Sequence, residues 1–151
     1  MVLFQKLWHI TMRDTTLQQL LPTYAIATAL VRCGDSFLIA KRSSKKKFAP
    51  NTWEFPSGFL DKSMPVEQLI LEELDEEFLI REGKIFKRGN PFVVRDTEAN
   101  WIVIPFLIDV PIKVAVLHPD EHSELKWVTR EEIYTFPDLT DLLPILTLLG
   151  K

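Results

Sequence analysis

Residues 58–80 constrain the fold of this chain more than any other stretch, because one helix must here combine an apolar face with a dense set of acids. Pro65 predicts a helix start, since a proline in the first turn gives up no hydrogen bond that the helix needs. Ser63, just before it, is a residue type that caps helices. Apolar residues then recur at helical spacing and predict one buried face: Val66, Leu69, Ile70, Leu74 and Phe78.

The same helix carries five acids within residues 72–77. Glu73, Glu76 and Glu77 are three and four residues apart, so they share one helical face, and Glu72 and Asp75 flank them. Like charges at this spacing destabilise a helix by roughly 0.2–0.5 kcal/mol per pair. A compensating partner is therefore expected, and a hard divalent cation with oxygen ligands suits best. The alternative is a solvated acidic face.

The composition indicates one globular domain in a reducing compartment. The chain has 151 residues, 46% hydrophobic, with a net charge of −3 that argues against binding to a nucleic-acid duplex. Cys33 is the only cysteine, so no internal disulfide forms. No apolar run is long enough to span a membrane, and Lys6 and His9 interrupt the N-terminal segment where a signal peptide needs an apolar core. We therefore expect a cytoplasmic protein without a membrane partner.

Apolar segments of strand length stand on both sides of the helix. Residues 24–32 and 37–42 flank a Gly-containing turn and predict a hairpin. Residues 84–95 predict a strand broken near Gly89. Residues 101–110 predict a central strand in which Pro105 marks a bulge or a local edge. A further short strand is expected at residues 113–117.

The C-terminal part begins with an acidic loop. Glu121 or Glu124 could bring a carboxylate from this loop to the acids of the helix, and a solvated loop is the alternative. His118 and His122 have a spacing that would suit a transition metal, although loop histidines are usually without such a role. Thr129 fits a helix cap. A final helix is expected from about residue 138 to residue 149, after a Phe-Pro turn and before a stop near the glycine at residue 150.

The helix and its approach resemble the Nudix box, G-x5-E-x7-R-E-U-x-E-E-x-G-U, in which U is a bulky apolar residue. The positions that match are Gly58, Glu73, Leu74, Glu76, Glu77 and Ile80. Residues 53–58, WEFPSG, resemble the WEFPGG approach of MutT-like members, with Ser57 in place of the first glycine. Residues 124–128 resemble the family's later signature, E-x-x-W-V.

Three box positions depart from the family pattern: Met64 replaces a Glu, Glu72 replaces the Arg, and Leu79 replaces the last Gly. In the family the Arg pairs with carboxylates and fixes their orientation, and the earlier Glu supports it. Because Met64 and Glu72 remove both partners together, the departures indicate altered support for the site rather than one unpaired charge. The loss of such support typically costs about 10–100-fold in metal affinity or activity.

Over residues 24–149 the resemblance implies the Nudix fold, an α/β fold with a mixed β-sheet sandwiched between α-helices. Residues 23–151 would form the Nudix hydrolase domain, and residues 1–22 an N-terminal extension packed on it. The implied reaction is Mg²⁺-dependent cleavage of a nucleoside diphosphate linked to another moiety, with Mn²⁺ as a substitute ion. A short chain without an added domain favours a nucleoside triphosphate as substrate. The alternative is a weak or inactive Nudix-derived module that binds a nucleotide or a protein.

The resemblance also implies the residues of the site. Metal ligands would be Gly58, through its carbonyl, with Glu73, Glu76, Glu77 and Glu121, and the four glutamates would also be catalytic. Glu121 would be an added ligand or the general base. Arg42 would meet substrate phosphates, with Lys45, Lys46 and Lys47 nearby in a solvated loop, and Glu54 would border the substrate site. Thr140 and Asp141 stand near the place where oxidised-guanine hydrolases carry a base-reading Asn, so that substrate is not predicted. A homodimer is left open.

Overall fold

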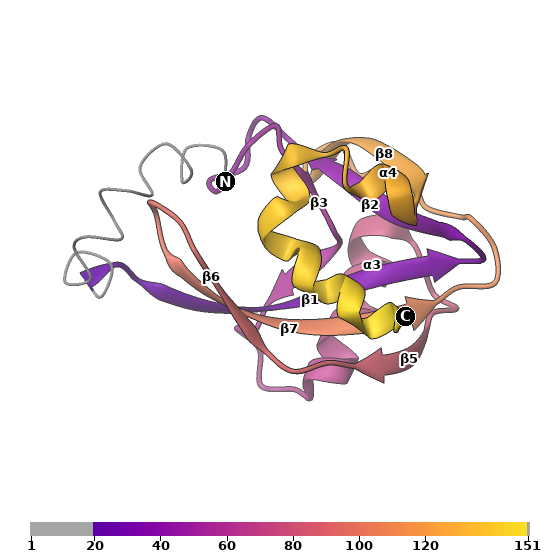
Figure 1. Cartoon of the computed structure of the whole chain (residues 1–151), viewed down its shortest axis with the longest axis horizontal. Helices are drawn as coiled ribbons and strands as arrows, with labels where there is room; N and C mark the ends of the chain where they lie inside the picture. The colour runs from indigo at the N-terminus through magenta and orange to yellow at the C-terminus, as the bar shows by residue number, and fades with distance from the viewer. Residues whose placement is uncertain (1–19, 151) are drawn as a thin grey trace.

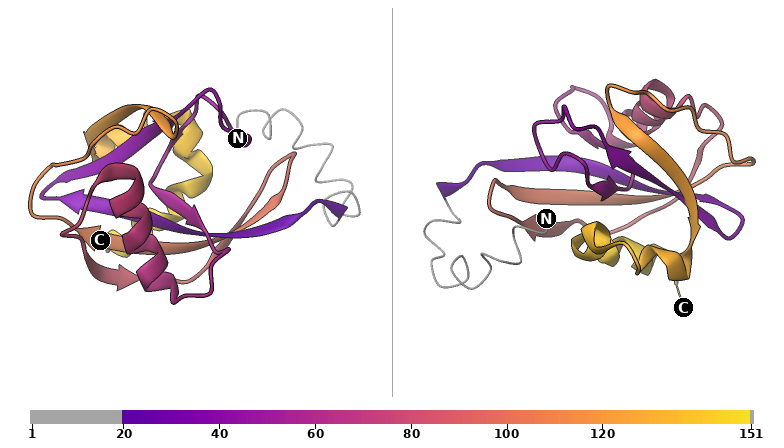
Figure 2. Two further views of the ribbon diagram at one scale, coloured as in Figure 1. Left: turned by 180° about the vertical axis from the view of Figure 1, so that it is seen from behind. Right: turned by 90° about the horizontal axis from the view of Figure 1, so that it is seen from above.

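The computed structural model describes residues 20–150, in which one mixed β-sheet is covered by a helix on each face (Figure 1). The elements in chain order are β1 (Thr23–Cys33), β2 (Ser36–Arg42), β3 (Trp53–Glu54), β4 (Ser57–Phe59), α3 (Val66–Phe78), β5 (Lys84–Arg88), β6 (Phe92–Arg95), β7 (Asn100–Asp109), β8 (His122–Thr129), α4 (Arg130–Ile133) and the 3₁₀ helix η1 (Pro137–Leu149). The α3 helix lies behind the sheet in Figure 1 and faces the viewer in the reverse view of Figure 2. This arrangement confirms the predicted α/β sandwich.

The sheet is built around β1, which pairs in parallel with β7 on one side and antiparallel with β2 and β4 on the other. The β1–β2 hairpin and the central position of β7 confirm two sequence predictions. β6 pairs with residues 100–103 of β7, and β5 pairs with residues 106–109. Pro105 therefore falls in the gap between β5 and β6, at the predicted local edge. A proline is tolerated there because no strand pairs with this part of β7 on that side and the missing N–H group costs no hydrogen bond of the sheet.

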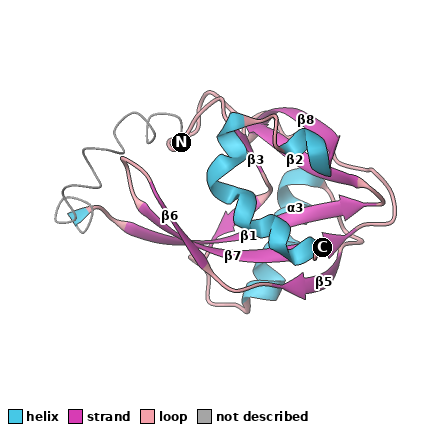
Figure 3. Cartoon of the chain, viewed as in Figure 1, coloured by secondary structure: helices cyan, strands magenta, loops and turns pink. Residues whose placement is uncertain are grey.

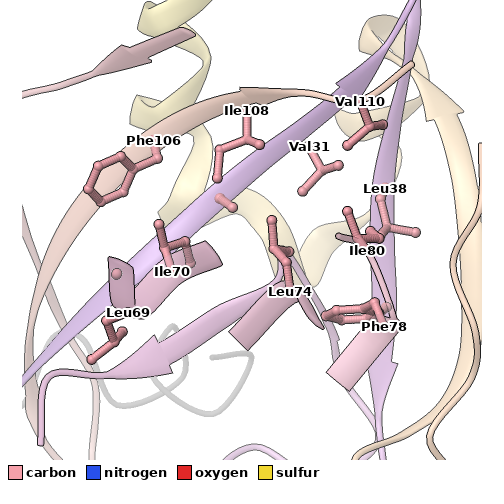
Figure 4. Close-up of a cluster of buried hydrophobic side chains, with 13 residues drawn as sticks. Val31, Leu38, Leu69, Ile70, Leu74, Phe78, Ile80, Phe106, Ile108 and Val110 are labelled. Carbon is pink, nitrogen blue, oxygen red and sulfur yellow. The ribbon is translucent and has the colours of Figure 1, made fainter. Parts of the chain in front are cut away.

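The α3 helix packs its apolar stripe against the sheet, as the periodicity predicts. Leu69, Ile70, Leu74 and Phe78 are buried, and they point toward side chains of the central strands in Figure 4. The helix start differs from the prediction, since Pro65 is the N-cap and no side chain caps the helix. Ser63 lies two residues too early to bond the first free N–H groups, so its predicted capping role was wrong.

The opposite face of the sheet is covered by α4 and η1, shown as helices in Figure 3. Thr129 and Glu132 form a complete capping box at the start of α4, which confirms the predicted cap. η1 follows the expected Phe136-Pro137 turn and ends before Gly150. Leu139, Ile145, Leu146 and Leu148 of η1 are buried in a second core with strand residues.

The predicted strand at residues 113–117 was wrong, because this segment has no strand neighbour and leaves Val114 and Val116 about half exposed, at 50% and 53%. The N–H of Val116 instead donates to the carbonyl of Phe78 at 2.9 Å. Residues 1–19 of the predicted N-terminal extension lie outside the described residues. No helix between residues 20 and 150 is long and apolar enough to cross a membrane.

Candidate metal and substrate site

Four glutamates from different parts of the chain gather beside the C-terminal half of α3. Glu73 and Glu77 come from α3, Glu54 ends β3, and Glu121 directly precedes β8. The Glu77 carboxyl is within electrostatic range of the other three. Helical spacing predicted that Glu73 and Glu77 would share a face, and the sheet brings Glu54 and Glu121 to that same face.

Glu54 is held from two sides. Nη1 of Arg42 donates to both carboxylate oxygens of Glu54, at 3.1 and 3.2 Å, and Nε2 of His122 lies 2.8 Å from Oε2. The Arg42 side chain is 18% exposed and the Glu54 side chain 16% exposed, so water competes little for these bonds. Nε of Arg42 also donates to the carbonyl of Phe48 at 2.8 Å. The structure thus places Arg42 as the partner of Glu54 at the border of the acids.

Glu121 has a cationic partner of its own. Nζ of Lys46 lies 2.6 Å from its Oε2, and both side chains are 29% exposed. Burial alone would raise the pKa of Glu121, but the hydrogen bond and charge of Lys46, together with a hydrogen bond from Glu77, leave this pKa below its ordinary value. Glu121 therefore remains ionised and accepts the hydrogen bond from Glu77.

Burial dominates the electrostatics of the two helix acids. Burial, together with the charges of Glu121, Glu54 and Glu73, raises the pKa of Glu77 from 4.5 to about 9. Burial also raises the pKa of Glu73, with Glu76 as the next contribution. In the absence of a cation, Glu77 therefore keeps a proton at neutral pH, because burial disfavours its charged form and the neighbouring carboxylates add to this effect.

Gly58 is required by its contact with Glu73. A Cβ atom at this position would lie 2.4 Å from Cγ and 2.8 Å from Cδ of Glu73, closer than any side chain tolerates. The glycine belongs to β4, where it pairs with Ala27 of β1. The absence of a side chain at Gly58 thus allows the Glu73 side chain to lie directly on the β4 backbone.

The other box acids lie further out. The Glu76 side chain is 60% exposed, with its Oε1 3.9 Å from Nζ of Lys62, so it borders the group rather than entering it. Oε1 of Glu72 accepts a hydrogen bond from the Gln68 amide at 3.0 Å on the exposed side of α3. The other two departures from the box, at Met64 and Leu79, have local explanations. Met64 packs against the core below α3, and Leu79 ends the helix with a left-handed φ of 54°, the conformation that glycine adopts most easily.

The donor chemistry of these acids fits a hard divalent cation, although the side chains lie further apart than the ligands of one bound ion. Within residues 20–150, no three His, Cys, Asp or Glu side chains converge tightly enough to hold a metal ion. Lys46, Arg42 and a retained proton on Glu77 occupy the carboxylates instead. Several carboxylate oxygens on one face, short of positive charge, are the donors that Mg²⁺ or Mn²⁺ prefer.

The histidines do not form the transition-metal pair that their spacing suggested. His118 is exposed in the loop, whereas His122 is buried, with a side chain only 2% exposed, and its Nε2 faces Glu54. The sequence reasoning thus missed His122 as a partner of Glu54, and Lys46 as the partner of Glu121. The available signal was position, since His122 directly follows Glu121 and opens the strand that carries the E-x-x-W-V signature.

An aromatic cluster adjoins the acids. The rings of Tyr24, Phe48, Phe59 and Trp101 lie with centroids 5.1–6.3 Å apart. The Phe48 carbonyl binds Arg42, and Phe59 directly follows Gly58, so two of the rings are attached to the segments that position the acids. Phe59 is 39% exposed, which leaves part of this apolar surface open.

Comparison with known proteins defines the family of this protein. Residues 22–147 match the NUDIX domain, so the chain belongs to the Nudix family. Its enzyme class is that of pyrophosphohydrolases, which act on acid anhydrides in phosphorus-containing compounds, here derivatives of nucleoside diphosphates. The resemblance seen in the box is thereby confirmed. No curated protein matches the chain significantly.

Solved structures share the fold. A MutT protein from Methanosarcina mazei Go1 is 24% identical, with a TM-score of 0.73, over 83% of this chain and 91% of the other. An Ap4A hydrolase from C. elegans, solved as a binary complex, is 18% identical, with a TM-score of 0.66, over 86% and 96%. A bifunctional NMN adenylyltransferase/ADP ribose pyrophosphatase from Francisella tularensis, solved with AMP and a Mn ion, is 20% identical, with a TM-score of 0.59, over 97% of this chain and 47% of the other.

Proposed function

We propose that this protein is a Mg²⁺-dependent hydrolase of a nucleoside triphosphate, with Mn²⁺ as a substitute ion. The observation that carries the proposal is the group of four glutamates, Glu54, Glu73, Glu77 and Glu121, in which burial and the charges of the other three raise the pKa of Glu77 to about 9. A divalent cation would relieve this repulsion and, when bound, would supply charge neutralisation for a diphosphate and acidify a bound water.

In this proposal Glu73, Glu76 and Glu77 hold the cation, with the Gly58 carbonyl beside them. Glu121 adds a ligand or accepts the proton of the attacking water, and its contact with Lys46 keeps it ionised and able to do so. Glu54, fixed by Arg42, adds negative charge at the border of the site.

The aromatic cluster of Tyr24, Phe48, Phe59 and Trp101 supports a nucleotide rather than inorganic pyrophosphate. A base needs a flat apolar surface, and aromatic rings provide one. Because Phe48 and Phe59 are joined to the acid-bearing segments, a base on this surface would leave its phosphates directed toward the carboxylates. The titles of the structural neighbours name different substrates, Ap4A and ADP ribose, so both compounds belong in any substrate test.

The alternative is a Nudix-derived module with little or no turnover, which binds a nucleotide or a protein. Met64 and Glu72 favour this alternative, because neither supports the acids of the site. Met64 packs against the core, and Glu72 accepts a hydrogen bond from Gln68. We further propose that residues 23–151 form the functional domain, with residues 1–22 as its extension. We also propose a cytoplasmic location, which is consistent with the single Cys33. Size-exclusion chromatography would show whether the protein forms a homodimer.

One panel separates the two functions. The protein is incubated with Mg²⁺ and nucleoside triphosphates, nucleotide sugars, ADP ribose and dinucleotides, and products are separated by chromatography. We expect turnover that Glu77→Gln abolishes, and Glu121→Gln to lower kcat by about 10²–10⁴-fold if it is the base. Glu124→Gln is the matched control, since its half-exposed side chain pairs with Lys126 away from the acids. Ligand binding without metal or product would instead establish the binding module.

A further inference from the structure

His122 is brought to the site by an irregularity between two strands. β2 pairs regularly with β8 from Ser36 to Lys41, but the next step passes over Ser123, so that Arg42 comes opposite His122. An extra residue in one strand redirects the side chains beside it, and such irregularities are frequent next to active sites. Here it brings Arg42 and His122 together beside Glu54.

The His122 ring contacts two of the segments that supply acids and is joined to a third. Nε2 lies 2.8 Å from Oε2 of Glu54 at the end of β3. The ring stacks on Phe78, which directly follows Glu77 on α3, with centroids 5.0 Å apart and planes at 28°. Glu121 is its neighbour in the chain. The ring therefore contacts the Glu54 carboxylate directly and adjoins the segments that carry Glu77 and Glu121.

Packing alone does not account for a histidine at this position. Its Nδ1 is buried and has no hydrogen-bond partner in the part of the chain that the structure describes. A buried polar atom without a partner costs free energy, and an apolar ring of similar shape would avoid that cost. The contact of Nε2 with Glu54 is what the imidazole gains over such a ring.

We propose that His122 is a positioning residue of this site: together with Arg42 it holds the Glu54 carboxylate in the direction that faces Glu77. Nη1 of Arg42 on β2 donates to both oxygens of Glu54, and Nε2 of His122 on β8 contacts Oε2, so the carboxylate cannot turn freely. In this arrangement Nε2 of His122 donates and the Glu54 carboxylate accepts, so a proton of the ring lies on Nε2. This inference rests on the proposed function of the acids, and its test is chosen to separate the two.

Two variants separate the effect of the stacked ring from the effect of its hydrogen bond to Glu54. His122→Phe keeps the stacking on Phe78 and removes the donor, whereas His122→Gln places an amide N–H where Nε2 lies. We expect His122→Phe to remain folded, to bind Mg²⁺ about 10–100-fold more weakly by calorimetry, and to lose a similar factor in kcat more than in KM. His122→Gln should recover most of both losses. His118→Gln, on the exposed loop, is the control and should match the wild type.

A nuclear magnetic resonance measurement on the metal-free wild type tests the same contact without activity. The imidazole ¹⁵N shifts should show the Nε2–H form, and the Nε2 signal should move in Glu54→Gln. The proposal is overturned if His122→Phe keeps wild-type Mg²⁺ affinity and kcat, if Gln rescues nothing in a folded protein, or if the proton is on Nδ1. If the wild type neither binds Mg²⁺ nor turns over any nucleotide, the proposed function fails, and the ring shifts still decide whether His122 holds Glu54.

Discussion

Glu77→Gln should make the metal-free protein more stable while it removes turnover. Burial, with the charges of Glu121, Glu54 and Glu73, raises the pKa of Glu77 from 4.5 to about 9. At neutral pH the carboxyl is therefore protonated in the folded chain and ionised in the unfolded chain. A Gln amide is neutral in both states and, like the protonated acid, can donate a hydrogen bond to Glu121.

The sign and size follow from proton linkage. Because the folded state holds this proton more tightly, the contribution of Glu77 to stability is fully present below about pH 4.5 and is lost as the pH rises toward about 9. Each pH unit in that window costs about 1.4 kcal/mol, so the wild type has lost about 3 kcal/mol at pH 7. Glu77→Gln does not suffer this loss. Its melting temperature should be higher by about 6–12 °C at neutral pH.

Urea denaturation in the presence of a chelator at about pH 5 and about pH 8 measures the effect. The difference in unfolding free energy between Glu77→Gln and the wild type should grow steadily between the two values. Glu72→Gln is the control, because Glu72 bonds Gln68 on the exposed side of the same helix, and its difference should stay constant. A constant difference for Glu77→Gln would show that Glu77 does not hold its proton, and the reasoning on the site would then be refuted.

Three further substitutions test the geometry. Leu79→Gly should raise the unfolding free energy in urea by about 1 kcal/mol, because a φ of 54° strains a leucine and the Leu79 side chain is 47% exposed. No gain would mean that the packing of the leucine side chain outweighs the backbone strain. Gly58→Ala should cost about 1–3 kcal/mol in unfolding free energy and weaken Mg²⁺ binding in calorimetry, since the new Cβ must displace Glu73; unchanged binding would contradict this. Thr129→Ala should lower the unfolding free energy in urea by about 1 kcal/mol, because the threonine side chain no longer accepts the hydrogen bond from the Glu132 N–H. Mg²⁺ affinity should stay unchanged, and an altered affinity would contradict the view that this cap stabilises only α4.

The elements that the sequence predicts well are those set by local periodicity. The buried stripe of α3 and the β1–β2 hairpin depend on residues close in the chain, and both are found in place. Residues 113–117 alternate like a strand, but a strand also needs a neighbouring strand, and here the N–H of Val116 donates to the carbonyl of Phe78 instead. Ser63 has the right side chain for a cap, yet the helix starts after Pro65, and such boundaries depend on how the chain arrives.

The candidate site also combines residues that the sequence predicts with contacts that it does not predict. Glu73 and Glu77 follow from helical spacing, and Glu121 from a family signature. The contacts of Glu54 with His122 and of Glu121 with Lys46 do not, because they depend on which strands pair and where the register slips. Pairing between residues so distant in the chain leaves no local pattern to read.

The parallel pairing of β1 with β7 also affects how the chain is made. The Arg32–Asp109 ion pair, at the end of that pairing, joins residues 77 positions apart. At roughly 5–20 residues per second, a ribosome needs several seconds to deliver β7 after β1 has emerged. During that interval the apolar inner face of the hairpin has only α3 to cover it, so newly made chains should depend on chaperones until the central strand arrives.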